Sequence, residues 1–343
     1  MRVLILGGTR FIGPAVVNRL LARACDVTVL HRGDHELDPA AAVAHIHADR
    51  AHLPDVRAEV ARLAPEVVLD MAPMTAHDAE GAMSLARGVA DRVVAVSSVD
   101  VYRAYGRLHG SEPGPPEPMP LNEDAPLREK LYPYRDDGRR EGLRDYDKIP
   151  AERIFMSDPG LPGTVLRLPA VYGERDYQHR LFMETARMDA ARPFLLWQQD
   201  ALHWRWPRAF AENVAEAIAL AVTDARAAGT IYNAPADPPL TQLEWLREYG
   251  RIAGWHGEVI GVPAELLPPH LKSANNYAQD IVVDDARIRD ELGYREVVPV
   301  DEGVRRAMAW TRAHPPATLH PRWLDYSLED AALAAFRGHP PGA

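Results

Sequence analysis

Cysteine is nearly absent from this chain, which has one, Cys25, among its 343 residues. A single cysteine excludes an internal disulfide framework and any thiolate metal cluster. The chain also lacks an apolar run of about eighteen residues, the length that a transmembrane helix needs, so we expect no membrane span. Its first residues read as a buried strand rather than a secretory leader. Together these absences favour a protein of the reducing cytoplasm.

An excess of positive charge is missing as well. The formal net charge is −10 at pH 7, which opposes nonspecific binding to nucleic acid. With 47% hydrophobic residues the chain can bury a sizeable core, in one large or two small domains. We therefore expect a small-molecule substrate, and neither nucleic acid nor a membrane as a partner.

What the chain does have is a glycine-rich turn close to its N-terminus. The apolar residues 3–6 predict a buried strand, and the glycines of residues 7–13 predict a tight turn into a helix. Pro14 suits the first turn of that helix, and residues 26–30 predict a second strand after it. The free amides at such a helix end bind a pyrophosphate. This segment predicts a dinucleotide site.

Strand-like and helix-like segments then alternate through the first half of the chain. We expect strands at 67–70, 93–98, 164–168 and 230–233, with helices around 55–63 and 78–90. This alternation predicts an α/β fold, a doubly wound and mostly parallel Rossmann sheet with a smaller, discontinuous C-terminal substrate domain. Ligands of such sheets bind beyond the carboxyl ends of the strands, where Gly7, Asp70, Ser98 and Pro169 would lie.

Breaks in this rhythm suggest domain boundaries. We assign residues 1–173 and 208–236 to the dinucleotide-binding domain, 174–207 and 237–315 to the substrate domain, and 316–343 to a C-terminal tail that wraps or frays. The Pro-rich segment 106–145 predicts a long loop, either a functional cover or disordered. Farther along, Thr241 and Glu244 form the pattern of a capping box that starts a helix.

The chain resembles the extended short-chain dehydrogenase/reductase family, the NAD-dependent epimerases and dehydratases, and within it the subgroup whose first turn reads Gly-Gly-Thr-Arg-Phe-Ile-Gly. The resemblance covers about residues 1–312 and places six matching stretches in the family's order. They are residues 7–13, 48–50, 97–102, Lys148 with Glu152, 167–173 and 285–294.

The resemblance implies roles for individual residues. Ser98 would hydrogen-bond a substrate oxygen, and Lys148 would hold the nicotinamide ribose and lower the pKa of a catalytic tyrosine. The cofactor would contact Gly7, Gly8, Thr9, Arg10, Phe11, Ile12, Gly13, His31, Arg32, Asp49 (at the adenine), Met71, Ala72, Pro73, Ser97, Lys148, Pro169 and Val171. The substrate would contact Tyr102, Tyr172, Arg205 and Arg208.

The chain departs from the family at the catalytic tyrosine. Relatives place it four residues before the lysine, and Arg144 stands there. Tyr146 lies two before Lys148, which on a regular helix turns it about 200° away. Three alternatives stay open: Tyr146 presented from an irregular turn before the helix, Tyr132 or Tyr134 reaching in from the long loop, or acid/base work by Asp100. This carboxylate stands where the related dehydratases carry an acidic base.

The second strand lacks the acid that usually bonds the ribose 2′-hydroxyl of NAD. It ends in His31 and Arg32, and Asp34 comes only later. Arg10 resembles the arginine that NADP-preferring relatives place beside the ribose, and with Arg32 it could clamp a 2′-phosphate. We predict NADP(H) over NAD(H) as cofactor.

Two further segments carry candidate chemistry. His45 and His47 share one face of a strand, with His31 and His35 nearby. Because a metal needs three or four converging ligands, we interpret this pair as ordinary edge polarity and expect no metal. Residues 203–208 mix aromatic rings with guanidinium groups, which suits either a substrate pocket or a core tryptophan pair flanked by surface charge.

These observations favour an NADP(H)-dependent oxidoreductase of the epimerase/dehydratase kind. Its reaction would be reduction, epimerisation or dehydration at a carbonyl or carbinol of a small molecule or nucleotide sugar, with Ser98, Lys148, Tyr146 and Asp100 as the catalytic residues. The alternative is a non-catalytic, redox-responsive NADP(H)-binding module with a degenerate active site. The resemblance also allows a homodimer.

Overall fold

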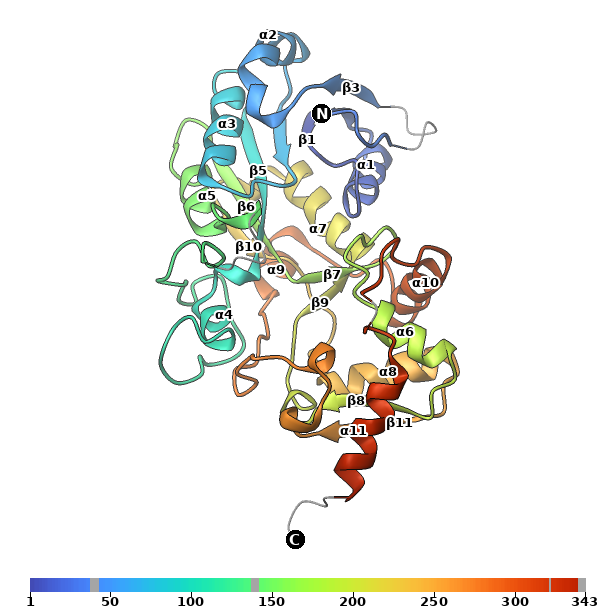
Figure 1. Ribbon diagram of the computed structural model, residues 1–343. Coiled ribbons are helices and arrows are strands. Elements are labelled where there is room, and N and C mark those ends of the chain that lie inside the picture. The colour runs from blue at the N-terminus through green and yellow to red at the C-terminus, as the bar shows by residue number, and fades with distance from the viewer. Residues whose placement is uncertain (38–42, 137–141, 321, 339–343) are drawn as a thin grey trace.

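The computed structural model describes residues 1–37, 43–136, 142–320 and 322–338. Its centre is a seven-stranded sheet, parallel throughout, with strands in the order β10-β6-β5-β4-β1-β2-β3 (Figure 1). The strands are β1 (Arg2–Leu6), β2 (Asp26–His31), β3 (Ala44–His47), β4 (Val67–Asp70), β5 (Arg92–Ser98), β6 (Gly163–Leu168) and β10 (Ile231–Asn233). The predicted doubly wound α/β sheet is confirmed.

Helices cover both faces of this sheet, because its strands are apolar on both sides. One core joins β1, β2 and β6 to α1 (Gly13–Ala22), α7 (Ala211–Thr223) and α9 (Ala286–Leu292). The other joins the opposite face to α2 (Leu53–Leu63), α3 (Ala76–Ala86) and α5 (Lys148–Phe155), and Figure 1 shows the two layers on either side. The strand order reverses between β4 and β2, with β1 in the middle, and such a switch point opens a crevice for a ligand.

A smaller set of elements packs beyond the carboxyl ends of the strands. Two parallel strand pairs lie there, β7 with β9 and β8 with β11. The elements are β7 (Ala170–Tyr172), α6 (Phe182–Asp189), β8 (Phe194–Gln198), β9 (Arg208–Phe210), α8 (Gln242–Ala253), β11 (Glu258–Val262), α10 (Val300–Ala313) and α11 (Tyr326–Gly338). The predicted capping box is present, since Thr241 and Glu244 bond each other's backbone at the start of α8.

The C-terminal tail does not fray over its described part. Residues 326–338 form α11, whose Ala332 and Leu333 pack against Leu196 of β8. Arg187 of α6 and Glu329 form an ion pair whose side chains are 4% and 0% exposed, which ties the helix to the body. Among the described residues no helix is long and apolar enough to cross a bilayer.

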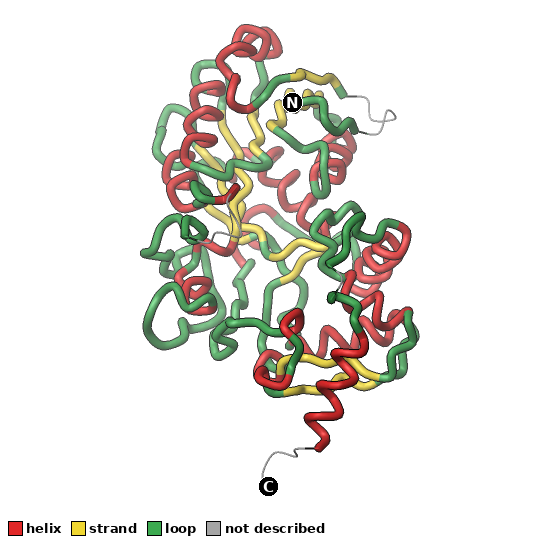
Figure 2. Tube along the Cα trace, viewed as in Figure 1, coloured by secondary structure: helices red, strands yellow, loops and turns green. Residues whose placement is uncertain are grey.

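The segment 106–145 begins as a helix, α4 (Arg103–Leu108), and continues to residue 136 without long regular elements (Figure 2). It is nevertheless held against the sheet. The amide of Leu121 donates to the carbonyl of Val282 at 2.7 Å, and the Asn233 side chain donates to the carbonyl of Leu121 at 2.9 Å. Backbone groups that a free loop would expose to water are therefore paired.

Candidate active site and dinucleotide cleft

The glycine turn after β1 has the geometry that the sequence predicts. Gly7 and Gly8 both have φ of +86°, which L side chains rarely adopt. A Cβ added to Gly13 would lie 2.1 Å from the carbonyl oxygen of Gly8, so only glycine allows α1 to start this close to the turn. Within the described part of the chain, the amides of residues 8–12 have no backbone or side-chain acceptor. A helix opening with free amides suits the two phosphates of a dinucleotide.

A cleft of 520 Å³ opens at this turn, a size typical of ligand sites. The predicted cofactor residues that line it are Gly7, Gly8, Thr9, Arg10, Phe11, Ile12, Gly13, His31, Arg32, Asp49, Met71 and Ala72. Nine lining residues were not among the predicted contacts: Leu6, Leu30, Asp34, His35, Ala48, Arg50, Met74, Asp78 and Tyr177. The glycine turn and the ends of β2 and β4 therefore share one cavity.

A buried ion pair forms the floor of the cleft. Arg50 donates to Oδ2 of Asp70 at 2.8 Å, and the Asp70 side chain is fully buried at the end of β4. Asp49, the predicted adenine contact, accepts the Ala51 amide on Oδ1 at 2.9 Å and so caps a short 3₁₀ turn. The sequence shows an arginine beside Asp49 and an acid, Asp70, at the end of a strand, but it does not show that Arg50 and Asp70 contact each other.

The end of β2 carries mixed charge. Arg32 pairs with Asp34 at 2.9 Å, and both side chains are more than half exposed. The guanidinium of Arg10 lies 4.9 Å from the centre of the Tyr177 ring. No carboxylate ends β2 itself, since His31 is its last residue.

A cluster of titratable side chains lies at the end of β5. Helix α5 begins at Lys148 with Asp147 as its cap, so Tyr146 precedes the helix and the helical-wheel argument against it does not apply. The Tyr146 hydroxyl donates to Oδ2 of Asp100 at 2.5 Å. The Lys148 amine lies 6.0 Å from the centre of the Tyr146 ring. Tyr146, Asp100 and Lys148 thus form one cluster.

Burial is the largest cause of the pKa shifts of Asp100, Tyr146 and Lys148. Burial raises the pKa of Asp100, although the Tyr146 hydrogen bond opposes that shift. Burial and then the neighbouring Asp100 charge hold the pKa of Tyr146 well above its ordinary value. Burial lowers the pKa of Lys148, whose amine donates to the carbonyls of Pro73 at 2.9 Å and Val96 at 3.2 Å. Oδ1 of Asp100 is buried and has no hydrogen-bond partner among the described residues.

Ser98 and one loop tyrosine also lie at this cluster. The hydroxyl oxygen of Ser98 accepts the Asp100 amide at 3.2 Å. The ring of Tyr134 lies 5.4 Å from that of Tyr146, centre to centre. Tyr132 instead packs under Arg135, 3.8 Å from its guanidinium. Of the alternatives left open by the sequence, the structure brings Tyr146, Asp100 and Tyr134 together.

Ser97 and Tyr102 take part in a buried hydrogen-bond network and do not line the cleft at the glycine turn. Ser97 donates to Glu152 at 2.5 Å, and Glu152 pairs with Arg167 at 2.8 Å. The Tyr102 hydroxyl donates to Asn233 at 2.6 Å and is fully buried. These polar groups satisfy one another and join β5, β6 and α5.

The other predicted substrate residues are likewise paired within the protein. The Tyr172 hydroxyl donates to Asp237 at 2.8 Å, and its side chain is buried. Arg208 donates to Gln242 at 2.6 Å, and Arg205 donates to Asp280 at 3.0 Å. Each of these residues thus has an internal partner, and none of Tyr102, Tyr172, Arg205 and Arg208 lines the cleft at the glycine turn.

Three of the remaining cofactor predictions lie outside the cleft. The Pro73 carbonyl accepts a hydrogen bond from the Lys148 amine, so Pro73 lies beside the cluster of Tyr146, Asp100 and Lys148. Val171 is 4% exposed and packs in the core of α1 and α7, and Pro169 is buried just before it. Val171 is held by core packing, which its apolar side chain favours.

Three features define an NAD(P)-binding enzyme of the extended short-chain dehydrogenase/reductase type. They are the parallel doubly wound sheet, the glycine turn with free amides at its switch point, and the set of Ser98, Tyr146 and Lys148 at the end of β5. Residues 3–134 match the model of the NAD dependent epimerase/dehydratase family. This match confirms the resemblance to that family seen in the sequence.

Known proteins resemble the chain well beyond the matched residues. It is 28% identical over 288 residues to 2′-dehydrokanamycin reductase of Streptomyces kanamyceticus, covering 81% of this chain and 74% of that protein. UDP-glucose 4-epimerase of Thermus thermophilus, solved with NAD, has a TM-score of 0.64 at 22% identity over 91% of this chain and 99% of that one. The WbmG enzyme of Bordetella bronchiseptica, solved with NAD and UDP, has a TM-score of 0.67 at 16% identity over 92% and 96%.

Proposed function

We propose that this protein is an NADP(H)-dependent oxidoreductase that acts on a carbonyl or carbinol of a sugar-type substrate, with Tyr146 and Asp100 moving the proton. The observation that carries the proposal is the 2.5 Å hydrogen bond from Tyr146 to Asp100, with Lys148 beside the same ring. The names of the relatives support the substrate class, since one is a 2′-dehydrokanamycin reductase and another is a UDP-glucose 4-epimerase.

A nicotinamide dinucleotide suits the cleft. The amides of the glycine turn would bind the two phosphates, and Met71 and Ala72 would lie along the cofactor toward Pro73 and Lys148. When bound, the nicotinamide exchanges a hydride with the substrate carbon. The protein's own task is then to orient the substrate oxygen and to move its proton.

The cluster can move that proton in either direction. In reduction, the O–H bond of Tyr146 breaks as a new O–H bond forms on the substrate oxygen, which Ser98 orients. Asp100, which is hydrogen-bonded to the Tyr146 hydroxyl, is the group through which a proton would return to the Tyr146 oxygen. Lys148, in its protonated form, stabilises the transient phenolate. Oxidation of a carbinol runs through the same steps in reverse.

Substitution of the proton donor tests the reaction. Tyr146→Phe should lower kcat by about 100-fold or more on an accepted sugar substrate, measured by nicotinamide absorbance and product analysis, with the cofactor Kd unchanged. Tyr326→Phe, in α11 far along the chain, is the matched control and should keep full activity. Lys148→Ala should weaken both cofactor binding and turnover. Full activity in both site variants would overturn the mechanism and favour the non-catalytic NADP(H)-binding module.

The cofactor preference has its own support. No acid ends β2, and Arg10 and Arg32 line the cleft there. Because Asp34 already pairs with Arg32, a 2′-phosphate has to compete with that carboxylate. Calorimetry should give tighter binding of NADP(H) than NAD(H), and Arg32→Ala should weaken NADP(H) about tenfold while leaving NAD(H) unchanged. Arg62→Ala, on exposed α2, is the control; equal losses for both cofactors would contradict the preference.

A further inference from the structure

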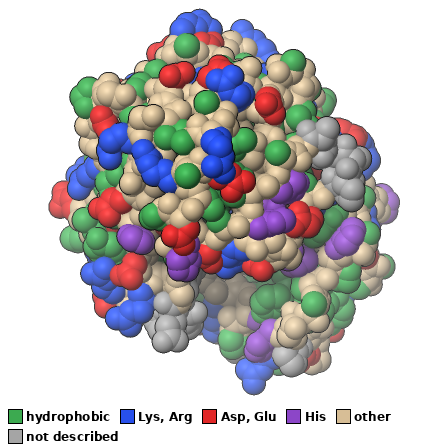
Figure 3. Space-filling view, turned by 90° about the horizontal axis from the view of Figure 1, so that it is seen from above, with side chains coloured by type: hydrophobic (Ala, Val, Ile, Leu, Met, Phe, Trp, Pro, Cys, Tyr) green, Lys and Arg blue, Asp and Glu red, His purple; other side chains and the backbone are tan. Residues whose placement is uncertain are grey.

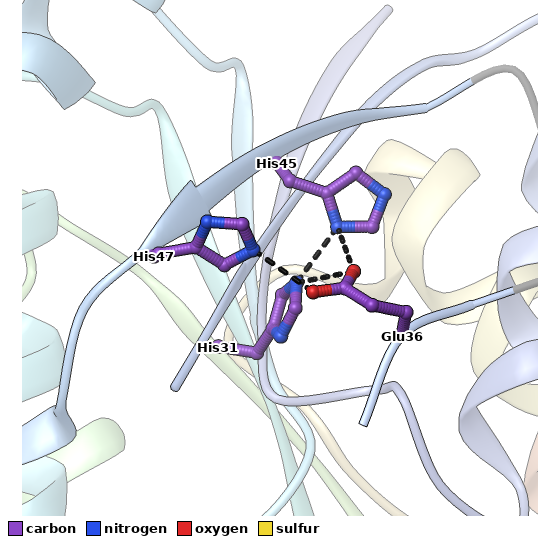
Figure 4. A group of neighbouring side chains, drawn as sticks. All are labelled: His31, Glu36, His45 and His47. Carbon is purple, nitrogen blue, oxygen red and sulfur yellow. Dashed lines mark hydrogen bonds and ion pairs between the residues drawn. The ribbon is translucent and has the colours of Figure 1, made fainter. Parts of the chain in front are cut away.

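Four potential metal ligands meet at the edge of the sheet, in His31, Glu36, His45 and His47 (Figure 4). One ligand atom from each lies within 4.8 Å of all the others. Oε2 of Glu36 lies 3.5 Å from Nε2 of His31 and 3.4 Å from Nδ1 of His45, and Oε1 lies 3.1 Å from Nε2 of His47. Four donors that surround one point are what a tetrahedral cation requires.

The backbone accounts for this convergence. His45 and His47 are two residues apart on the edge strand β3, so their side chains share one face. His47 is the register partner of His31, the last residue of β2, which brings the third ring to the same face. Glu36 arrives from the segment after β2. In the view from above, histidine side chains gather next to acidic ones on this part of the surface (Figure 3).

The electrostatics favour a cation here. Three imidazole rings and one carboxylate meet here, and neutral imidazole is the ligand form of histidine. The ring of His31 lies 5.0 Å from that of His45 and 4.8 Å from that of His47, centre to centre. Three protonated rings this close would repel one another, whereas one divalent ion satisfies them together with the carboxylate.

Both nitrogens of the His31 ring take part in hydrogen bonds. The Gly33 amide donates to Nδ1 of His31 at 3.1 Å, so the neutral ring carries its proton on Nε2, which lies 2.7 Å from Nδ1 of His45. A metal would replace that proton. The two nitrogens would then move to about 3.3 Å apart, the spacing of tetrahedral ligands at zinc distances, and the Gly33 contact would lengthen as Nδ1 takes up the proton.

We propose that His31, Glu36, His45 and His47 bind one divalent transition-metal ion of the zinc class. Three imidazoles favour such an ion over Mg²⁺ or Ca²⁺, which prefer oxygen ligands. Bound there, the ion would join the segment after β2 to strand β3. His31 also lines the dinucleotide cleft, so the ion would stiffen the cleft wall beside Arg32.

Metal binding to the full chain, made without a histidine tag and stripped by a chelator, tests the proposal. Zn²⁺ titrated against a chromophoric chelator should bind at one ion per chain with a Kd below about 1 μM. Co²⁺ should give the visible absorption of a tetrahedral site. The variant His45→Ala/His47→Ala should weaken binding by about 100-fold or more. The variant Glu36→Gln should weaken it about tenfold while keeping all three rings.

The matched control is His35→Ala, a neighbouring histidine outside the cluster. It should bind zinc as tightly as the unchanged chain. If the double variant does not fold, as judged by circular dichroism, His47→Ala serves instead, because that side chain is 57% exposed. Zinc binding that is equally weak in the unchanged chain and the double variant, or lost equally in His35→Ala, overturns the proposal. The readout needs no cofactor, so it stands apart from any failure of the proposed reaction.

Discussion

Replacing Gly13 with alanine tests the central packing of the cleft. The added Cβ would lie 2.1 Å from the carbonyl oxygen and 2.3 Å from the carbonyl carbon of Gly8. Ordinary contact needs more than 3.4 Å, so the start of α1 has to move away from the turn by about 1 Å. We expect Gly13→Ala to lower the free energy of unfolding by about 3 kcal/mol, the cost of an overpacked core position.

The same movement should disrupt the cofactor site. A charge-assisted hydrogen bond contributes about 1.5–3 kcal/mol, so two lost bonds from turn amides to phosphate correspond to more than about 100-fold weaker binding. Urea denaturation followed by circular dichroism measures the first effect. Titration of nicotinamide fluorescence measures the second, at temperatures where the variant is folded.

Gly81 provides the matched control, since it lies inside helix α3 with room for a methyl group. An added Cβ there would lie 3.5 Å from Cδ1 of Leu53, which is ordinary contact. Gly81→Ala should therefore stabilise the protein by about 0.5–1 kcal/mol and leave cofactor affinity unchanged. If Gly13→Ala is as stable as the unchanged chain and binds the cofactor equally well, the close approach of α1 to the turn is not what builds the site.

Three further predictions concern other parts of the molecule. Burial raises the pKa of Asp237 from 3.8 to about 6, so its protonated form stabilises the fold at low pH. About 3 kcal/mol of that stability is lost as pH rises to 6. Asp237→Asn should remove this pH dependence of stability, measured in urea titrations at pH 4 and 7. Arg187→Met leaves the buried Glu329 without its guanidinium partner, with the His270 ring 3.6 Å away, so it should cost about 3–5 kcal/mol in thermal unfolding, and Glu329→Leu should restore most of that. Asn233→Ala removes the bond to Leu121 and should expose residues 119–125 to limited proteolysis, whereas unchanged protection would contradict that tether.

Elements with a strong local signal were predicted closely from the sequence. The strand expected at 67–70 is β4, and the strands expected at 93–98 and 164–168 differ from β5 and β6 by one residue at the first end. Continuous β-branched runs have few alternatives to a buried strand, and the Thr241–Glu244 box marks its helix start by local hydrogen bonds alone. The helix expected at 78–90 was displaced, because Thr75 caps α3 earlier and the helix ends at Ala86.

Features built from contacts between distant residues could not be predicted. The Arg50–Asp70 floor, the partners that bury Tyr102, and the ion pair holding α11 each join side chains far apart in the chain. The position of the Tyr146 ring depended on where α5 begins, because Tyr146 lies two residues before the first residue of that helix and is therefore not placed by the regular helical turn.

The sequence by itself determined a dinucleotide fold, because glycine spacing and apolar runs act on their immediate neighbours. The tertiary structure decided which polar groups share a site, including the Tyr146–Asp100 pair and the meeting of Glu36 with three histidines. Sheet register and helix starts set those distances, and both depend on the packing of the whole chain.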